Sequence, residues 1–113
     1  TNQSGIQRGY YSLIDYTKIC LHMLKEFERI GIDIEIRACP HHPETNCKCR
    51  KPKIGMFLDD RHEDDIMIGD QNSDMLAAKN AGIKHRWLLS ENVNSEYSTK
   101  KFLSHANLLK YLI

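Results

Sequence analysis

Four side chains of the kinds that commonly bind metals occur within one short loop. The pattern C-x-H-x5-C-x-C places them at Cys39, His41, Cys47 and Cys49. Thiolate and imidazole ligands in this number are what tetrahedral zinc prefers, so we predict a closed, structural zinc site in a loop at residues 39–52. His41 is favoured over His42 as the ligand because it keeps the x-spacing symmetrical with Cys47 and Cys49. The alternative is a loop with free thiols and a surface histidine.

Two cations, Arg50 and Lys51, follow the last of these cysteines directly. A metal that fixes the loop would also fix where they point, and a guanidinium beside an ammonium suits a phosphate group. The alternative is a pair of solvated surface charges.

A pair of carboxylates, Asp70 and Asp74, forms the pattern G-D-x3-D after an apolar run. Open α/β sheets bind ligands at the carboxyl ends of their strands, and a carboxylate there suits Mg²⁺. The alternative is that Asp70 or Asn72 caps the next helix and Asp74 interacts with its dipole.

The first half of the chain predicts a helix followed by a strand. Ser12 is the expected N-cap, with Asp15 three residues later, and Gly31 ends the helix. We expect Cys20 and Met23 to lie in the core. The alternation from Ile32 to Arg37 predicts a strand that leads into the metal loop.

The second half alternates strands and helices. We expect a short helical segment at 55–58, a buried strand at 65–70, a helix from about Ser73 to a Gly82 cap and a strand at 83–89. Residues 90–101 are polar and turn-rich, and Ser104 is the expected cap of a last helix. This order predicts an α/β fold, a Rossmann-like parallel sheet with flanking helices.

Composition excludes several classes of protein. The chain has 16 Lys and Arg against 15 Asp and Glu, a net charge of +1, which argues against a nucleic-acid partner. Its apolar runs are shorter than the roughly 18 to 20 residues of a membrane span. Clustered cysteines fit a reducing compartment better than a disulfide framework. We therefore expect one domain over residues 1–113, a cytoplasmic monomer.

Several motifs in order resemble one family. They are T-N-Q-S-G-I-x-R-G at 1–9, C-P-H-H-P and C-x-C-R-K-P within 39–52, G-M at 55–56, and I-G-D-x3-D-M-x-A-A-x-x-A-G at 68–82. Together they resemble the haloacid dehalogenase superfamily, and within it the zinc-containing phosphatases of D-glycero-D-manno-heptose 1,7-bisphosphate and of histidinol phosphate. The first two motifs resemble the heptose enzymes of carbohydrate and lipopolysaccharide precursor biosynthesis. The compact spacing from His41 to Cys47 is similar to the histidinol-phosphate ones.

The resemblance implies a magnesium-dependent phosphatase that works through an aspartyl phosphate. It implies the following roles: Thr1 and Asn2 contact the transferring phosphoryl group, Lys51 stabilises its charge, Asp70 binds Mg²⁺, Asp74 orients Lys51, and Arg50 and Arg8 contact a substrate phosphate.

The nucleophile of such enzymes lies in a D-x-D segment that this chain does not contain. Asp59-Asp60-Arg61 does not replace it, because the D-x-D spacing and a preceding apolar strand are both missing. We expect that segment upstream of Thr1, on the order of 30 residues or more, so we expect residues 1–113 to form a partial domain that is inactive by itself. Of the three candidate functions, we favour hydrolysis of the β-anomer of heptose 1,7-bisphosphate over histidinol phosphate. The third is a non-catalytic zinc-binding interaction module.

Overall fold

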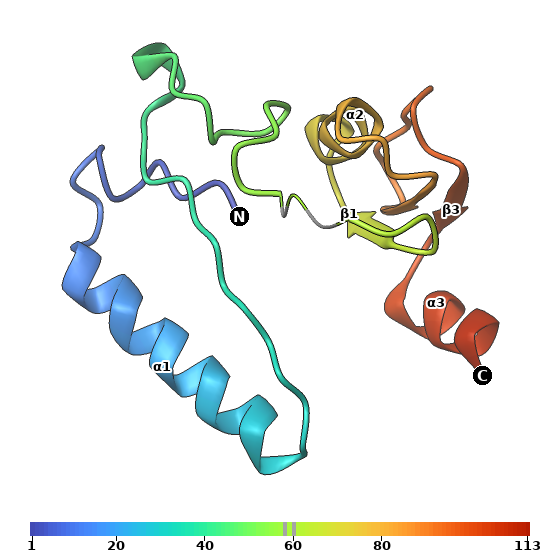
Figure 1. Ribbon diagram of the computed structural model, residues 1–113, viewed down its shortest axis with the longest axis horizontal. Coiled ribbons are helices and arrows are strands. Elements are labelled where there is room, and N and C mark those ends of the chain that lie inside the picture. Colours follow the sequence, from blue (N-terminus) through green and yellow to red (C-terminus); the bar gives the residue numbers. More distant parts are fainter. Residues whose placement is uncertain (58, 60) are drawn as a thin grey trace. The chain divides into compact units, whose positions relative to one another are not determined.

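The computed structural model describes residues 1–57, 59 and 61–113 (Figure 1). The chain divides into two compact units, Thr1–Arg50 and Lys51–Ile113. Each unit is described by itself below.

The first unit is built around one long helix, α1 (Leu13–Arg29). Its start is as expected, because the Ser12 hydroxyl accepts a hydrogen bond of 3.0 Å from the backbone N–H of Asp15. At its other end Gly31 takes a φ of +76°, a left-handed conformation that glycine adopts without strain. A short 3₁₀ helix, η1 (Pro43–Thr45), interrupts the loop that follows.

The expectation that Cys20 and Met23 belong to a core is wrong. The structure describes all of α1, and none of its residues is buried. Cys20 is half-buried, and Met23 is 36% exposed. The apolar residues of α1 do recur at helical spacing. The apolar face of a helix is buried only where another element covers it, and no sheet forms among the described residues of this unit.

The predicted strand at 32–37 is also wrong. Ile34 and Ile36 are half-buried while their neighbours are exposed, so the alternation of the sequence is present as alternating burial. No ladder of hydrogen bonds forms along this segment of the described chain. Instead, an isolated parallel bridge joins Asn2 to Cys39 just beyond it. Alternation reports which side chains face inward, whereas a strand also needs a partner backbone.

The second unit contains a parallel sheet of three strands in the order β1-β2-β3. Its strands are β1 (Ile66–Gly69), β2 (His85–Leu89) and β3 (Lys100–Phe102). Helix α2 (Asn72–Asn80) connects β1 to β2, and α3 (His105–Leu112) follows β3. The predicted α/β class is therefore confirmed, with strands and helices within a few residues of their expected bounds.

One strand was missed. Residues 90–101 were expected to be turns, yet Lys100 pairs with Trp87 and Phe102 with Leu89. A three-residue strand with two lysines carries too little pattern to identify alone, and its conformation comes from pairing with β2. The helical segment expected at 55–58 is a turn at 55–57, and Leu58 lies outside the described residues.

One part of the core of this unit lies between α2 and the sheet, and a second cluster joins β2, β3 and α3 through Trp87, Phe102 and Leu108. Met75, Ala77 and Ala78 of α2 are fully buried, as is Leu88 of β2. The helix ends as predicted, since Gly82 has a φ of +79° just after its last turn. Ser104 accepts a hydrogen bond from the Asn107 N–H and caps α3. Across the described part of the chain, no helix has the length and apolar character needed to cross a membrane.

Candidate functional site

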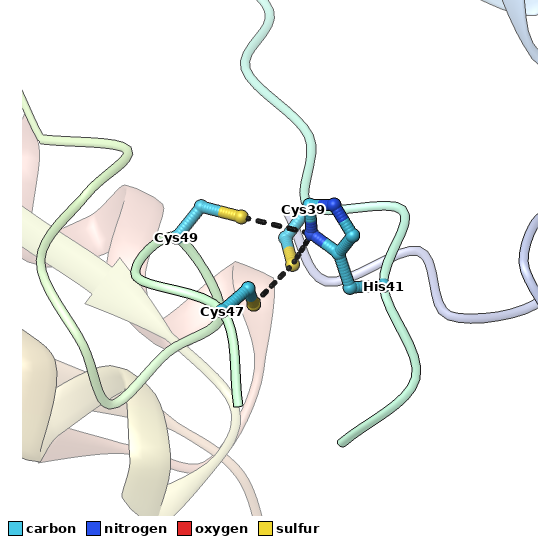
Figure 2. A group of neighbouring side chains, drawn as sticks. All are labelled: Cys39, His41, Cys47 and Cys49. Atoms are coloured by element: carbon cyan, nitrogen blue, oxygen red, sulfur yellow. Dashed lines mark hydrogen bonds between the residues drawn. The ribbon is translucent and has the colours of Figure 1, made fainter. Parts of the chain in front are cut away.

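The four predicted metal ligands come together in the first unit. Figure 2 shows the side chains of Cys39, His41, Cys47 and Cys49 pointing toward one another. Cys39 Sγ lies 3.5 Å from both His41 Nδ1 and Cys47 Sγ, and His41 Nδ1 lies 3.2 Å from Cys49 Sγ. All four ligand atoms lie within 4.8 Å of one another.

These separations fit zinc better than any covalent pairing. Zinc bonds of about 2.3 Å to sulfur and about 2.0 Å to nitrogen, at tetrahedral angles, place ligand atoms roughly 3.5 to 3.8 Å apart. A disulfide would need about 2.0 Å between the sulfurs, and none of the four cysteines is in a disulfide. Since four protein ligands fill a tetrahedron, such a site has no open position for a substrate.

Two thiols of this cluster differ in pKa because each is partly buried and hydrogen-bonded to its neighbours. Burial alone would raise the pKa of Cys47, but hydrogen bonds from the Arg50 backbone and from the neighbouring thiols lower it to about 6. Burial and the hydrogen bonds with Cys39 and Cys47 raise the pKa of Cys49 to about 12. Placing three thiolates together is unfavourable without a cation, which is what a divalent metal would provide.

The local backbone explains why His41, and not its neighbour, joins the cluster. His42 Nδ1 accepts a hydrogen bond of 3.2 Å from the Glu44 N–H and caps η1. After η1, Asn46 takes a left-handed conformation with φ +54°, which asparagine tolerates better than most residues. The chain thereby reverses between the His41 and Cys47 positions.

A buried ion pair lies in the second unit. Lys51 Nζ contacts Asp74 Oδ1, with the lysine side chain 16% exposed and Asp74 5% exposed. The other oxygen, Asp74 Oδ2, accepts hydrogen bonds from the backbone N–H groups of Asp70 (3.1 Å) and Gln71 (3.0 Å). The carboxylate is therefore held on both sides, and it fixes the lysine in turn.

Gly69 makes this arrangement possible. A Cβ at that position would overlap the side chain of Asp74, closer than any van der Waals contact allows. Only glycine lets the end of β1 approach the first turn of α2 so closely. The G-D-x3-D pattern by itself gives Gly69 no role, because the close approach is visible only in three dimensions.

Asp70 follows β1 directly, and its side chain is exposed. The N-cap of α2 is Gln71, so the alternative that Asp70 or Asn72 caps this helix is wrong. Asp74 does lie in the first turn, as the dipole alternative requires, but it also pairs with Lys51. An exposed carboxylate at the carboxyl end of a parallel strand is well placed for Mg²⁺ and a phosphate.

The remaining predicted residues lie in the first unit. Thr1 O accepts a hydrogen bond of 2.9 Å from the Cys39 N–H, and Thr1 Oγ1 accepts one of 2.9 Å from Gln3 Nε2. Arg8 is exposed and donates from Nε to Ser4 Oγ at 3.2 Å. Arg50 is half-buried, and its Nη1 has no hydrogen-bond partner among the described residues. Thr1 and Asn2 thus lie beside Cys39, whereas Lys51, Asp70 and Asp74 belong to the other unit.

Comparison with known proteins gives close relatives. A D-glycero-alpha-D-manno-heptose-1,7-bisphosphate 7-phosphatase of Campylobacter jejuni is 42% identical over 98% of this chain and 67% of its own length. The chain belongs to this phosphatase family. A D-glycero-beta-D-manno-heptose-1,7-bisphosphate 7-phosphatase of Helicobacter pylori is 44% identical over 81% of the chain and 58% of its own length. No family model matches the chain.

A solved structure of a heptose bisphosphate phosphatase supports the same assignment. The D,D-heptose 1,7-bisphosphate phosphatase from B. bronchiseptica, complexed with magnesium and phosphate, has a TM-score of 0.75 and 29% identity to this chain. The match covers 99% of this chain and 70% of the other. The fold is therefore that of the haloacid dehalogenase-like heptose bisphosphate phosphatases, and the resemblance found in the motifs is confirmed. The chain spans just under three fifths of the Helicobacter relative.

Proposed function

We propose that this chain is the larger part of a magnesium-dependent phosphatase acting on D-glycero-β-D-manno-heptose 1,7-bisphosphate. The observation that carries the proposal is the buried Lys51–Asp74 pair beside Asp70 at the carboxyl end of β1. A cation fixed next to a free carboxylate can hold a phosphoryl group and a divalent metal together. The magnesium and phosphate in the solved relative agree with this chemistry.

In the proposed reaction, Asp70 binds Mg²⁺, whose charge offsets that of the phosphate oxygens. Lys51 stabilises the negative charge of the transferring group, and Asp74 holds Lys51 in place. Thr1 and Asn2 contact the phosphoryl oxygens, while Arg50 and Arg8 contact a substrate phosphate. An aspartate outside residues 1–113 would attack phosphorus, breaking its bond to the sugar oxygen and releasing the heptose monophosphate as a protonated hydroxyl; water would then hydrolyse the aspartyl phosphate.

The Cys/His cluster would serve this reaction as a structural zinc site. Its four ligands leave no position for substrate, so its role is to shape the loop at 39–52 that ends in Arg50 and Lys51. We propose that residues 1–113 form part of one phosphatase domain. We also propose a cytoplasmic monomer without a nucleic-acid or membrane partner; the near-neutral charge speaks against nucleic acid, and cysteines outside disulfides fit a reducing compartment.

Zinc content tests the metal site directly. We expect about one equivalent of zinc in freshly purified full-length protein, and less than half an equivalent in Cys49→Ser, because three ligands hold zinc far less tightly than four. Cys20→Ser is the matched control, since this cysteine lies in α1 outside the cluster. His41→Ala should lose zinc and His42→Ala should keep it. Equal zinc in all four variants would contradict the site.

Phosphate release by the full-length protein tests the substrate. With Mg²⁺ present, we expect kcat/KM for the β-anomer of heptose 1,7-bisphosphate to exceed that for histidinol phosphate by at least about tenfold. The α-anomer, named for the Campylobacter relative, is the other sugar to measure. Faster turnover of histidinol phosphate would overturn the substrate assignment. No magnesium-dependent turnover of any phosphate ester would favour the non-catalytic zinc-binding module.

A further inference from the structure

A glutamine outside the predicted ligand set connects the N-terminal turn, residues 1–9, to the metal loop. The carboxamide oxygen of Gln7 accepts a hydrogen bond of 2.5 Å from the His42 N–H and one of 3.1 Å from the Thr45 hydroxyl. Both donors lie in the 42–45 turn, between two of the candidate zinc ligands and the other two.

The orientation of this carboxamide follows from the chemistry of its partners. A backbone N–H can only donate, so the atom facing His42 must be the amide oxygen rather than the nitrogen. An oxygen with two lone pairs can accept from His42 and Thr45 together. The backbone of Gln7 is fixed as well, because its own N–H donates to Pro40 O at 3.2 Å.

The same two segments are joined further along by backbone hydrogen bonds. Gln3 N–H donates to Cys39 O at 2.7 Å, and Cys39 N–H donates to Thr1 O at 2.9 Å. The contacts of Gln7 therefore continue a line of hydrogen bonds that starts at Thr1, passes the buried ligand Cys39 and reaches the turn after His41. Ordering one segment restricts the other.

We infer that Gln7 is a positioning residue that couples metal binding in the Cys/His cluster to the order of the turn that carries Thr1. This inference rests on the zinc site of the proposed function. Such coupling is reciprocal: if metal orders the turn, then weakening the turn also weakens the binding of the metal. The zinc would thereby contribute to the placement of Thr1 as well as to the loop that ends in Lys51.

The first test is the rate of zinc release from the full-length protein to an excess of a chromogenic chelator. Loss of two exposed hydrogen bonds in Gln7→Ala should speed release about three- to tenfold. Gln7→Glu keeps an oxygen acceptor for both donors and should release zinc at nearly the rate of the unchanged protein. Release by Gln7→Ala within twofold of that rate would overturn the inference, and so would a Gln7→Glu variant as fast as Gln7→Ala.

The second test is amide hydrogen exchange of Gln3 and Gln7 in the same full-length protein, followed by NMR. Removing zinc should speed exchange at both amides several-fold, while the Ala77 amide in α2 of the other unit serves as the reference. Exchange at Gln3 and Gln7 that does not respond to zinc would overturn the inference, as would a protein that takes up no zinc. If zinc binding and turn order prove to be coupled in a protein that has no phosphatase activity, the proposed reaction is wrong and the inference about Gln7 still holds.

Discussion

Asp74→Asn is expected to cost about 3 to 5 kcal/mol of folding free energy, because it breaks a buried ion pair by removing one partner. The asparagine oxygen can still accept from the backbone N–H groups of Asp70 and Gln71, so the start of α2 is preserved. Its amide nitrogen would then face the Lys51 ammonium, which loses its carboxylate partner. Denaturant unfolding of the full-length protein measures the loss.

Two further variants separate the ion pair from general disturbance of the fold. Asp64→Asn neutralises an exposed carboxylate in the same unit and should change stability by no more than about 0.5 kcal/mol. Lys51→Met combined with Asp74→Asn should recover part of the loss, because an apolar side chain no longer needs a charged partner. If Asp74→Asn is as stable as Asp64→Asn, the Lys51–Asp74 ion pair does not contribute to the free energy of unfolding as predicted.

Asp70→Asn is expected to lower magnesium-dependent kcat/KM of the full-length phosphatase by at least about 100-fold. Loss of residues that merely support a metal ligand costs about 10- to 100-fold, and Asp70 is proposed as a ligand itself. The asparagine keeps the shape of the side chain but not the negative charge that a hard cation prefers. Initial rates across a series of Mg²⁺ concentrations measure the effect.

The stability of this variant distinguishes a lost ligand from a lost fold. The Asp70 side chain is exposed, and its backbone N–H, which donates to Asp74, is unchanged by the substitution. Unfolding of Asp70→Asn should therefore match that of the unchanged protein, while Asp64→Asn should keep both stability and activity. If the rate of Asp70→Asn depends on Mg²⁺ concentration as that of the unchanged protein does, Asp70 is not a magnesium ligand.

The candidate zinc site shows how much residue spacing alone can predict. Cys39, His41, Cys47 and Cys49 were identified from their types and intervals, because both C-x-C and C-x-H spacings bring side chains to the same side of a short loop. The structure adds the separations of 3.2 to 3.5 Å between neighbouring ligand atoms. It also gives His42 a different partner, the Glu44 N–H, which no interval could have indicated.

Elements with local signals were predicted well, and elements that depend on a distant partner were not. Ser12, Gly31, Gly82 and Ser104 mark helix ends through contacts with residues a few positions away, so their sequence signals are sufficient. The strand expected at 32–37 does not form, and the strand at Lys100–Phe102 was not predicted. Both errors have the same cause. Strand formation depends on which backbone lies alongside, and that backbone can be far away in sequence.

By itself, the sequence determined the family, the α/β class, the candidate metal ligands and the candidate carboxylates, because these depend on residue types at short, fixed intervals. Tertiary structure alone decided the close approach of Gly69 to Asp74, the burial of the Lys51–Asp74 pair and the contacts of Gln7 with the 42–45 turn. Each of these joins residues whose separation in space is set by the folded path of the chain, and no local pattern encodes it.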